Sequence, residues 1–148
     1  MAELMFDSIL IVCTGNICRS PIAERILRSL LPAKKIDSAG TGALVDHPAD
    51  LSAERVALKH GVSLENHKGK QFSSSLARKY DLILVMEKGH QEQIARIAPE
   101  ASGKTMLLGH WLDYKEIPDP YRKSDEAFDS VYQLIDLASK CWAEKLSG

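Results

Sequence analysis

Short apolar runs alternate along the chain with longer segments in which apolar residues recur every three or four positions. The runs Ser8–Cys13 and Leu82–Met86 are aliphatic almost throughout, which predicts strands covered on both faces. Weaker patterns predict two more strands, Lys35–Ala39 and Thr105–Leu108. Because these runs alternate with helical patterns, we expect βαβ units around a parallel sheet.

The first predicted helix follows the first strand after a loop that contains Gly15. Ser20 is expected to be its N-cap and Pro21 its first residue, and Pro32 ends it. Its apolar stripe consists of Ile22, Ala23, Ile26, Leu27, Leu30 and Leu31. The sequence therefore predicts a strand, a tight loop and a helix in direct succession.

Three further helices are predicted. One covers Leu51 to His60, and a weaker one runs through Ile94 to Pro99. The last begins after Ser124, a good N-cap residue. The apolar stripe of this last helix consists of Phe128, Val131, Ile135, Ala138 and Trp142.

Composition narrows the class of protein. A chain of 148 residues with 45% hydrophobic and 26% charged residues predicts one globular domain over residues 1–148, large enough to fold without a disulfide or a structural metal. The start, Met1–Asp7, lacks a secretory signal and there are only three cysteines, so we expect a cytoplasmic protein. No apolar run approaches the about 18 residues of a membrane span, so no membrane insertion is expected. The net charge of −1, with dispersed lysines and arginines, argues against nucleic-acid binding.

The candidate chemistry lies between the first strand and the first helix. Cys13 ends the strand and Arg19 lies six positions later, so a loop that folds back would aim both at one point. The intervening N–H groups can form a concave nest for phosphate oxygens, and a guanidinium donates to two oxygens at once. A helix N-terminus and an arginine both favour a thiolate, so Cys13 is a candidate nucleophile. The predicted phosphate-binding residues are Thr14, Gly15, Asn16, Ile17, Cys18 and Arg19.

Two residues of this loop have candidate supporting roles, and a distant residue has a catalytic one. Ser20 is placed to donate its hydroxyl to the Cys13 thiolate, and Asn16 tolerates the left-handed backbone that such a loop needs. Asp119 stands between two prolines, which stiffen its loop and aim its carboxyl group. It is the candidate general acid that protonates the leaving group. No metal or other cofactor is required, because Arg19 and the loop amides supply the charge stabilisation.

Three segments together resemble the low-molecular-weight protein tyrosine phosphatases. They are Cys13 to Pro21, with the sequence CTGNICRSP, then Ser38-Ala39-Gly40, and Asp119-Pro120-Tyr121. The resemblance extends over almost the whole chain. The segments Gly109 to Trp111 and Glu116 to Arg122 are most similar to the bacterial subgroup that is paired with tyrosine autokinases of capsule and exopolysaccharide export.

The resemblance implies a fold, an activity and site residues. The fold is a three-layer α/β/α sandwich with a four-stranded parallel sheet, of the flavodoxin-like or Rossmann-like kind. The activity is hydrolysis of phosphotyrosine through a phosphoenzyme on Cys13, with Arg19 as clamp and Asp119 as acid. Hydrogen bonds of Asn16, Ser20 and Ser38 hold the loop, and Leu44 and Tyr121 form the substrate slot.

The same resemblance implies a partner, and this chain differs from many relatives at two positions. The implied substrate is a phosphotyrosine protein, a membrane tyrosine autokinase reached from the cytoplasmic side, and the phosphatase is expected to be a monomer. Leu44 stands where many relatives carry an aromatic residue, and Arg122 stands where eukaryotic members often carry a second tyrosine.

Several alternatives compete with this hypothesis. Arsenate reductases of the same fold pass electrons through cysteines downstream of the loop, but beyond Cys18 only Cys141 remains, on the apolar side of the last helix, where a buried inert thiol is expected. A non-catalytic phosphotyrosine-binding module would keep Arg19 but have no use for Cys13 or Asp119. Cys18 itself either packs inside the loop or forms a reversible disulfide with Cys13, and both possibilities stay open. The five histidines show no metal-ligand spacing, so surface or core positions are expected for them.

Overall fold

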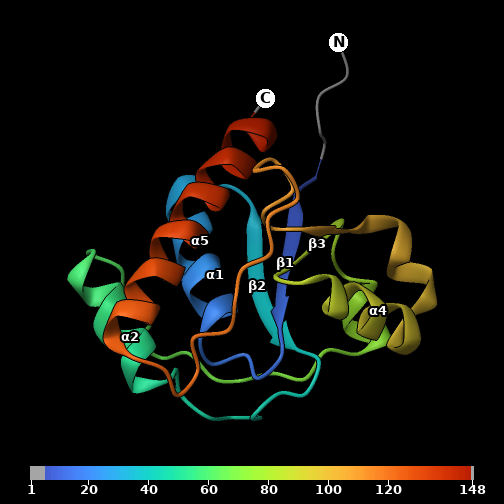
Figure 1. Cartoon of the computed structure of the whole chain (residues 1–148). Coiled ribbons are helices and arrows are strands. Elements are labelled where there is room, and N and C mark those ends of the chain that lie inside the picture. The colour runs from blue at the N-terminus through green and yellow to red at the C-terminus, as the bar shows by residue number, and fades with distance from the viewer. Residues whose placement is uncertain (1–5, 148) are drawn as a thin grey trace.

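The computed structural model describes residues 6–147 and contains a four-stranded sheet between two layers of helices (Figure 1). The strands are β1 (Ser8–Cys13), β2 (Lys35–Gly40), β3 (Leu82–Val85) and β4 (Thr105–Leu107). Their order in the sheet is β2-β1-β3-β4, and each neighbouring pair is parallel. The predicted α/β/α fold with a four-stranded parallel sheet is confirmed.

Each face of the sheet is covered by its own group of helices. One group comprises α1 (Arg19–Leu30), α2 (Leu51–Lys59) and α5 (Asp125–Leu146), and the other comprises α3 (Ser74–Ala77), α4 (Lys88–Ile97) and the 3₁₀ helix η1 (Pro99–Lys104). Successive residues of β1 point to opposite faces, as a pleated strand requires. Ile9 and Ile11 therefore pack with the first group, and Leu10 and Val12 pack with the second. This two-sided burial explains why the strand is apolar throughout.

The order of the strands indicates where a ligand-binding site is expected. From β1 the chain crosses to β2 on one side and later returns to β3 on the other, so β1 stands where the direction of strand order reverses. Open α/β sheets bind ligands outside the carboxyl ends of their strands at such a position. In Figure 1 the loops after β1 and β2 lie at the lower end of the molecule, opposite the last turn of α5. No helix within residues 6–147 has the length and apolar character needed to cross a membrane.

The structure corrects three local predictions and contains two short helices that were not predicted. Ser20 is not the N-cap of α1, because the helix begins at Arg19 and the Ser20 side chain is turned into the protein. Leu30, predicted in the apolar stripe, is exposed at the last residue of the helix, whereas Leu27 and Leu31 on either side of it are buried. Cys141 is half-buried rather than buried. The helices α3 and η1 were not predicted, since each is short and polar. The Ser124 cap of α5 is confirmed by its hydrogen bond from the Ala127 N–H.

Candidate active site

The loop between β1 and α1 turns its N–H groups toward one point. The five successive carbonyl oxygens of residues 13–17 accept hydrogen bonds from outside the loop, at 2.5–3.1 Å. The donors are the N–H groups of Thr41, Gly42, Leu44 and Asp50 and the side chain of His67. None of the peptide bonds described between residues 6 and 147 is cis, so the N–H of each of these peptide units points opposite to its carbonyl. The N–H groups of residues 14–18 therefore face inward and form a nest that suits an anion.

Two backbone features make this curvature possible. Asn16 has a φ of 59°, in the left-handed region that asparagine tolerates better than most residues, as the sequence predicts. Gly40 at the end of β2 lies directly against the loop, and a Cβ atom there would lie 2.2 Å from the Thr14 carbonyl oxygen. Only glycine fits this close approach of two backbones.

The side chain of Asn16 supports the loop from behind. Its amide nitrogen donates to Ser20 Oγ at 2.8 Å and to Ser38 Oγ at 3.0 Å, and its amide oxygen accepts from the Lys70 N–H at 2.9 Å. Asn16, Ser20 and Ser38 are all buried. The three residues predicted to hold the loop therefore form one network behind it.

Each serine of this network accepts one hydrogen bond from Asn16 and has its own proton free for a second partner, which is a thiol in one case and a carboxylate in the other. Ser20 Oγ already accepts from Asn16, so its proton is available to Cys13 Sγ, 2.9 Å away. Ser38 Oγ likewise accepts from Asn16 and donates to Glu24 Oε1 at 2.8 Å. One amide group thus orients two hydroxyl groups, and one of them is aimed at the candidate nucleophile. A donor in this position stabilises a thiolate.

Arg19 is held firmly although it faces the pocket. One of its terminal nitrogens donates to Glu87 at 2.5 Å and to the Ile117 carbonyl oxygen at 2.7 Å. The other terminal nitrogen lies 3.9 Å from Asp119 Oδ2. The side chain is only 2% exposed, so these contacts leave little freedom to the guanidinium. Its remaining N–H groups can therefore bind an anion in the nest with a fixed geometry.

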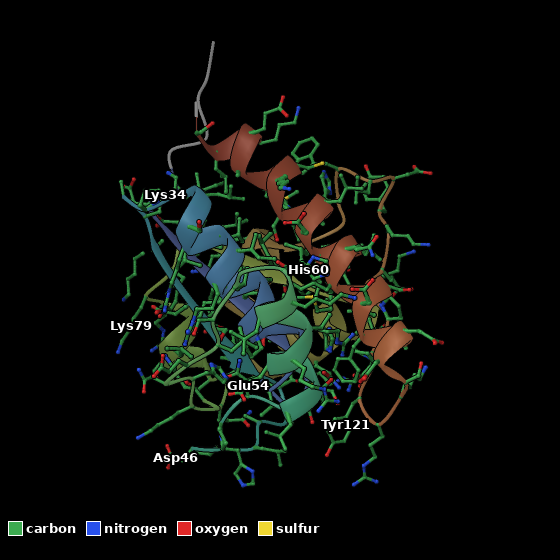
Figure 2. The ribbon with its side chains drawn as sticks, turned by 90° about the vertical axis from the view of Figure 1, so that its left-hand side faces the viewer. Lys34, Asp46, Glu54, His60, Lys79 and Tyr121 are labelled. Carbon is green, nitrogen blue, oxygen red and sulfur yellow. The ribbon has the colours of Figure 1, made fainter. Side chains whose placement is uncertain are left out.

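Asp119 and Tyr121 come from the loop that precedes α5. The Tyr121 N–H donates to Asp119 Oδ1 at 3.0 Å, which leaves Oδ2 as the carboxylate oxygen on the Arg19 side. Figure 2 shows Tyr121 at the same end of the molecule as Asp46, a residue of the loop between β2 and α2. Two loops far apart in the sequence thus border the loop between β1 and α1, since Leu44 donates its N–H to the Gly15 carbonyl oxygen and Tyr121 lines the same pocket.

Together these groups enclose a pocket of about 160 Å³. Its lining comprises Cys13, Thr14, Gly15, Ile17, Cys18, Arg19, Leu44, Asp119 and Tyr121. The structure therefore brings together every predicted site residue, with nine in the wall of the pocket and Asn16, Ser20 and Ser38 behind the loop. Leu44 and Tyr121 give the mouth of the pocket an apolar surface next to the polar base.

The environment of Cys18 bears on its two predicted roles. The thiol is buried, and this burial is the largest cause of a strong rise in its pKa, to which the charges of Asp50, Cys13 and Asp119 add. A thiol that stays protonated is a poor attacking group in disulfide exchange. Both Cys13 and Cys18 are free thiols in this structure. The environment favours packing inside the loop, and the disulfide stays a prediction.

Sequence analysis missed four residues of this site. Glu87 and His90 reach it from the start of α4, His67 bonds the Asn16 carbonyl oxygen, and Glu24 ends the serine network. No short motif connects them to the loop, because their partners lie 14 to 76 positions away along the chain. Glu87 could have been suspected from its position just after β3, because the carboxyl ends of the neighbouring parallel strands β1 and β3 lie side by side.

The chain was compared with known families, sequences and structures. Residues 8–148 match the family model for low molecular weight phosphotyrosine protein phosphatases. The chain is 60% identical to the low molecular weight protein-tyrosine-phosphatase Etp of Escherichia coli K12, over 99% of both chains. It is also similar to the solved structure of the tyrosine phosphatase Wzb from Escherichia coli K30 with sulphate, with a TM-score of 0.95, 75% identity and coverage of 96% and 99%. A second similar structure is Vibrio vulnificus Wzb with benzylphosphonate, with a TM-score of 0.94, 56% identity and coverage of 95% and 99%.

Proposed function

Because this chain belongs to the low molecular weight phosphotyrosine protein phosphatase family and is a protein-tyrosine-phosphatase, we propose that its catalysis proceeds through a phosphoenzyme on Cys13. The observation that carries this proposal is the position of Cys13 Sγ at the base of the nest, 2.9 Å from the Ser20 hydroxyl. The inward N–H groups and Arg19 hold the phosphoryl group above the sulfur. Stabilisation of charge that develops in the transition state is the main effect expected of such fixed donors.

The reaction takes place in two displacements. First, the Cys13 thiolate attacks phosphorus, the S–P bond forms, and the P–O bond to the tyrosine ring breaks. Asp119 Oδ2 gives its proton to the departing phenolate oxygen. Second, the ionised Asp119 takes a proton from water as the water oxygen attacks phosphorus. The S–P bond then breaks, and the products are inorganic phosphate and the thiolate.

Preference for an aryl ester is proposed from the mouth of the pocket. Leu44 and Tyr121 flank the entrance, where the ring of phosphotyrosine would pass between them. Benzylphosphonate, which is bound in the similar Vibrio vulnificus Wzb structure, also carries an aromatic ring on a phosphorus group. A phosphoserine side chain is shorter and would leave these apolar side chains without contact.

Kinetics with two aryl phosphates test the assignment of the nucleophile and the acid. Cys13→Ser should abolish turnover of p-nitrophenyl phosphate in metal-free buffer. Asp119→Asn should slow phenyl phosphate by roughly 10²–10⁴-fold, since general acid catalysis contributes about that much. It should slow p-nitrophenyl phosphate less, because the p-nitrophenolate group leaves without a proton. Turnover by the Cys13→Ser variant, or equal losses on both esters, would contradict the proposal.

The biological setting is proposed from the subgroup to which the chain is similar. We place the phosphatase in the cytoplasm as a monomer with one catalytic domain over residues 1–148, acting on a membrane tyrosine autokinase of capsule or exopolysaccharide export. The match to the family model over residues 8–148 supports the single domain. The Asp119→Ala variant should retain its phosphoprotein substrate in cell extract, and mass spectrometry would identify it. Capture of other phosphotyrosine proteins without the kinase would overturn this choice of substrate.

A further inference from the structure

The third residue of α4, His90, connects two walls of the pocket although it does not line the pocket. Its side chain is buried, with 3% exposure. Its Nδ1 atom lies 3.1 Å from the Glu87 backbone nitrogen, and its Nε2 atom lies 3.0 Å from Thr14 Oγ1. Thr14 and His90 are separated by 76 positions, so this contact joins α4 to the phosphate-binding loop.

The hydrogen bonds define which nitrogen of His90 carries the proton. A backbone N–H can only donate, so Nδ1 must accept from Glu87 with its lone pair. In a neutral ring Nε2 then carries the proton and donates to Thr14 Oγ1. Burial, reinforced by the positive charge of Arg19, lowers the pKa of His90 to about 4, and the neutral ring is the form present at pH 7.

The two partners of His90 belong to different parts of the phosphate site. Thr14 belongs to the first two peptide units of the nest. The carbonyl oxygens of these two units, on Cys13 and Thr14, accept hydrogen bonds from the N–H groups of Thr41 and Gly42. Glu87 accepts the 2.5 Å hydrogen bond from Arg19. The imidazole therefore stands between the N–H groups and the guanidinium, which must bind the same phosphoryl group together.

We propose that His90 is a positioning residue that sets the distance between the amide wall and the arginine wall of the phosphate site. This inference rests on the proposed function, because it assumes that the loop binds a phosphoryl group. The Nδ1 contact anchors the ring to the start of α4, and the Nε2 contact anchors the edge of the loop to the ring. Loss of the second contact lets the loop edge move away from Arg19, which weakens binding of any tetrahedral oxyanion.

Two amide variants separate these contacts. Asparagine places its amide group near the position of Nδ1, so His90→Asn keeps an acceptor for the Glu87 N–H but loses the donor to Thr14. Glutamine places its amide nitrogen near the position of Nε2, so His90→Gln restores that donor. Thr14→Val removes the hydroxyl from the other side of the same hydrogen bond and changes the side-chain shape little.

The experiment measures the dissociation constant of inorganic phosphate by calorimetry and kcat/KM with phenyl phosphate. His90→Asn and Thr14→Val should each weaken phosphate binding about 10-fold, as expected for one lost hydrogen bond, and should lower kcat/KM by a similar factor. His90→Gln should stay within about 3-fold of the wild type. The double variant His90→Asn/Thr14→Val should lose no more than either single variant, because both remove the same contact.

Other outcomes overturn the inference. Equal losses in His90→Asn and His90→Gln would show that the imidazole acts only in the core of α4, and additive losses in the double variant would show that Thr14 and His90 act independently. These results would leave the proposed function intact as long as Cys13-dependent turnover persists. Failure of the wild-type protein to bind phosphate would instead overturn the proposed function itself.

Discussion

The carboxylate of Glu87 and the guanidinium of Arg19 lie 2.5 Å apart, next to the proposed phosphate site. Arg19 is almost fully buried, whereas 39% of the Glu87 side chain is exposed. The carboxylate therefore keeps contact with solvent while it restrains the buried guanidinium. This pairing leaves the guanidinium face that points into the pocket available for phosphate oxygens.

Removing the charge of Glu87 should loosen Arg19. For Glu87→Gln we expect kcat/KM with aryl phosphates to fall about 10- to 100-fold, because hydrogen bonds to charged groups contribute roughly 1.5–3 kcal/mol. Steady-state kinetics provide the measurement. Glu116→Gln is the matched control, since Glu116 bonds the Lys88 N–H at the same helix end. An equal loss in both variants would indicate a general effect of charge at this helix end.

The Ser20 hydroxyl should determine how readily Cys13 reacts. In Ser20→Ala the sulfur loses its 2.9 Å donor, so alkylation by iodoacetamide at pH 7 should slow about 10-fold, and kcat should fall by a similar factor. Ser38→Ala removes the other hydroxyl of the Asn16 network without touching the sulfur. Its alkylation rate should stay within about 2-fold of the wild-type rate. Identical rates for Ser20→Ala and wild type would remove Ser20 from this role.

The ring of Tyr121 should affect the aryl group and leave the phosphate unaffected. We expect Tyr121→Ala to raise the KM for phenyl phosphate about 10-fold, which matches the roughly 0.5–1.5 kcal/mol of an aromatic contact at its upper end. Inhibition by inorganic phosphate should not change, because the N–H that orients Asp119 belongs to the backbone. Tyr114→Ala, at another exposed tyrosine, is the control. A parallel loss of phosphate inhibition would count against a separate aryl slot.

His90 should make the folded protein sensitive to acid. Its pKa is lowered from an ordinary value of 6.5 to about 4, so between these values the unfolded chain binds the proton and the folded protein does not. The free energy of unfolding therefore rises with pH in this window and falls as the solution is acidified. Between pH 7 and pH 5 the wild type should lose about 2 kcal/mol more than His90→Asn.

Urea unfolding of both proteins at the two pH values measures this difference. His67, whose pKa is also lowered by burial, acts in the same direction but is present in both proteins and cancels. Equal pH dependence in the two proteins would mean that His90 has the same proton affinity in the folded and unfolded states.

The sequence predicts well what is local in this protein. The strand that ends at Cys13, the loop and the helix that follows it are adjacent along the chain, and their signals are an apolar run, a glycine and a proline. The prediction that Ser20 caps the first helix was wrong, and the reason is physical. A serine before a helical proline is a common N-cap, but here the buried Cys13 and Asn16 side chains use its hydroxyl, and tertiary contacts outweigh the local preference.

Contacts between residues that follow different strands leave little signal in the sequence. Glu87 and His90 follow β3, and only the pairing of β3 with β1 brings them to the loop. Neither residue belongs to a recognisable spacing, and His90 is one of five histidines that look alike in the sequence. Asp119 was found without such pairing because its two flanking prolines mark a stiff loop. Its proximity to Arg19, however, depends on the way the chain returns after β4.

The outward hydrogen bonds of the loop carbonyls have a consequence for the end of the reaction cycle. Because these bonds within the protein hold the loop in its curved shape, an incoming oxyanion has little rearrangement to drive. The same preorganisation serves the product, since inorganic phosphate presents the same tetrahedral oxygens as the phosphoryl group of the ester. We therefore expect free phosphate to compete with the ester for an already formed site and to inhibit turnover in a phosphate-rich solution.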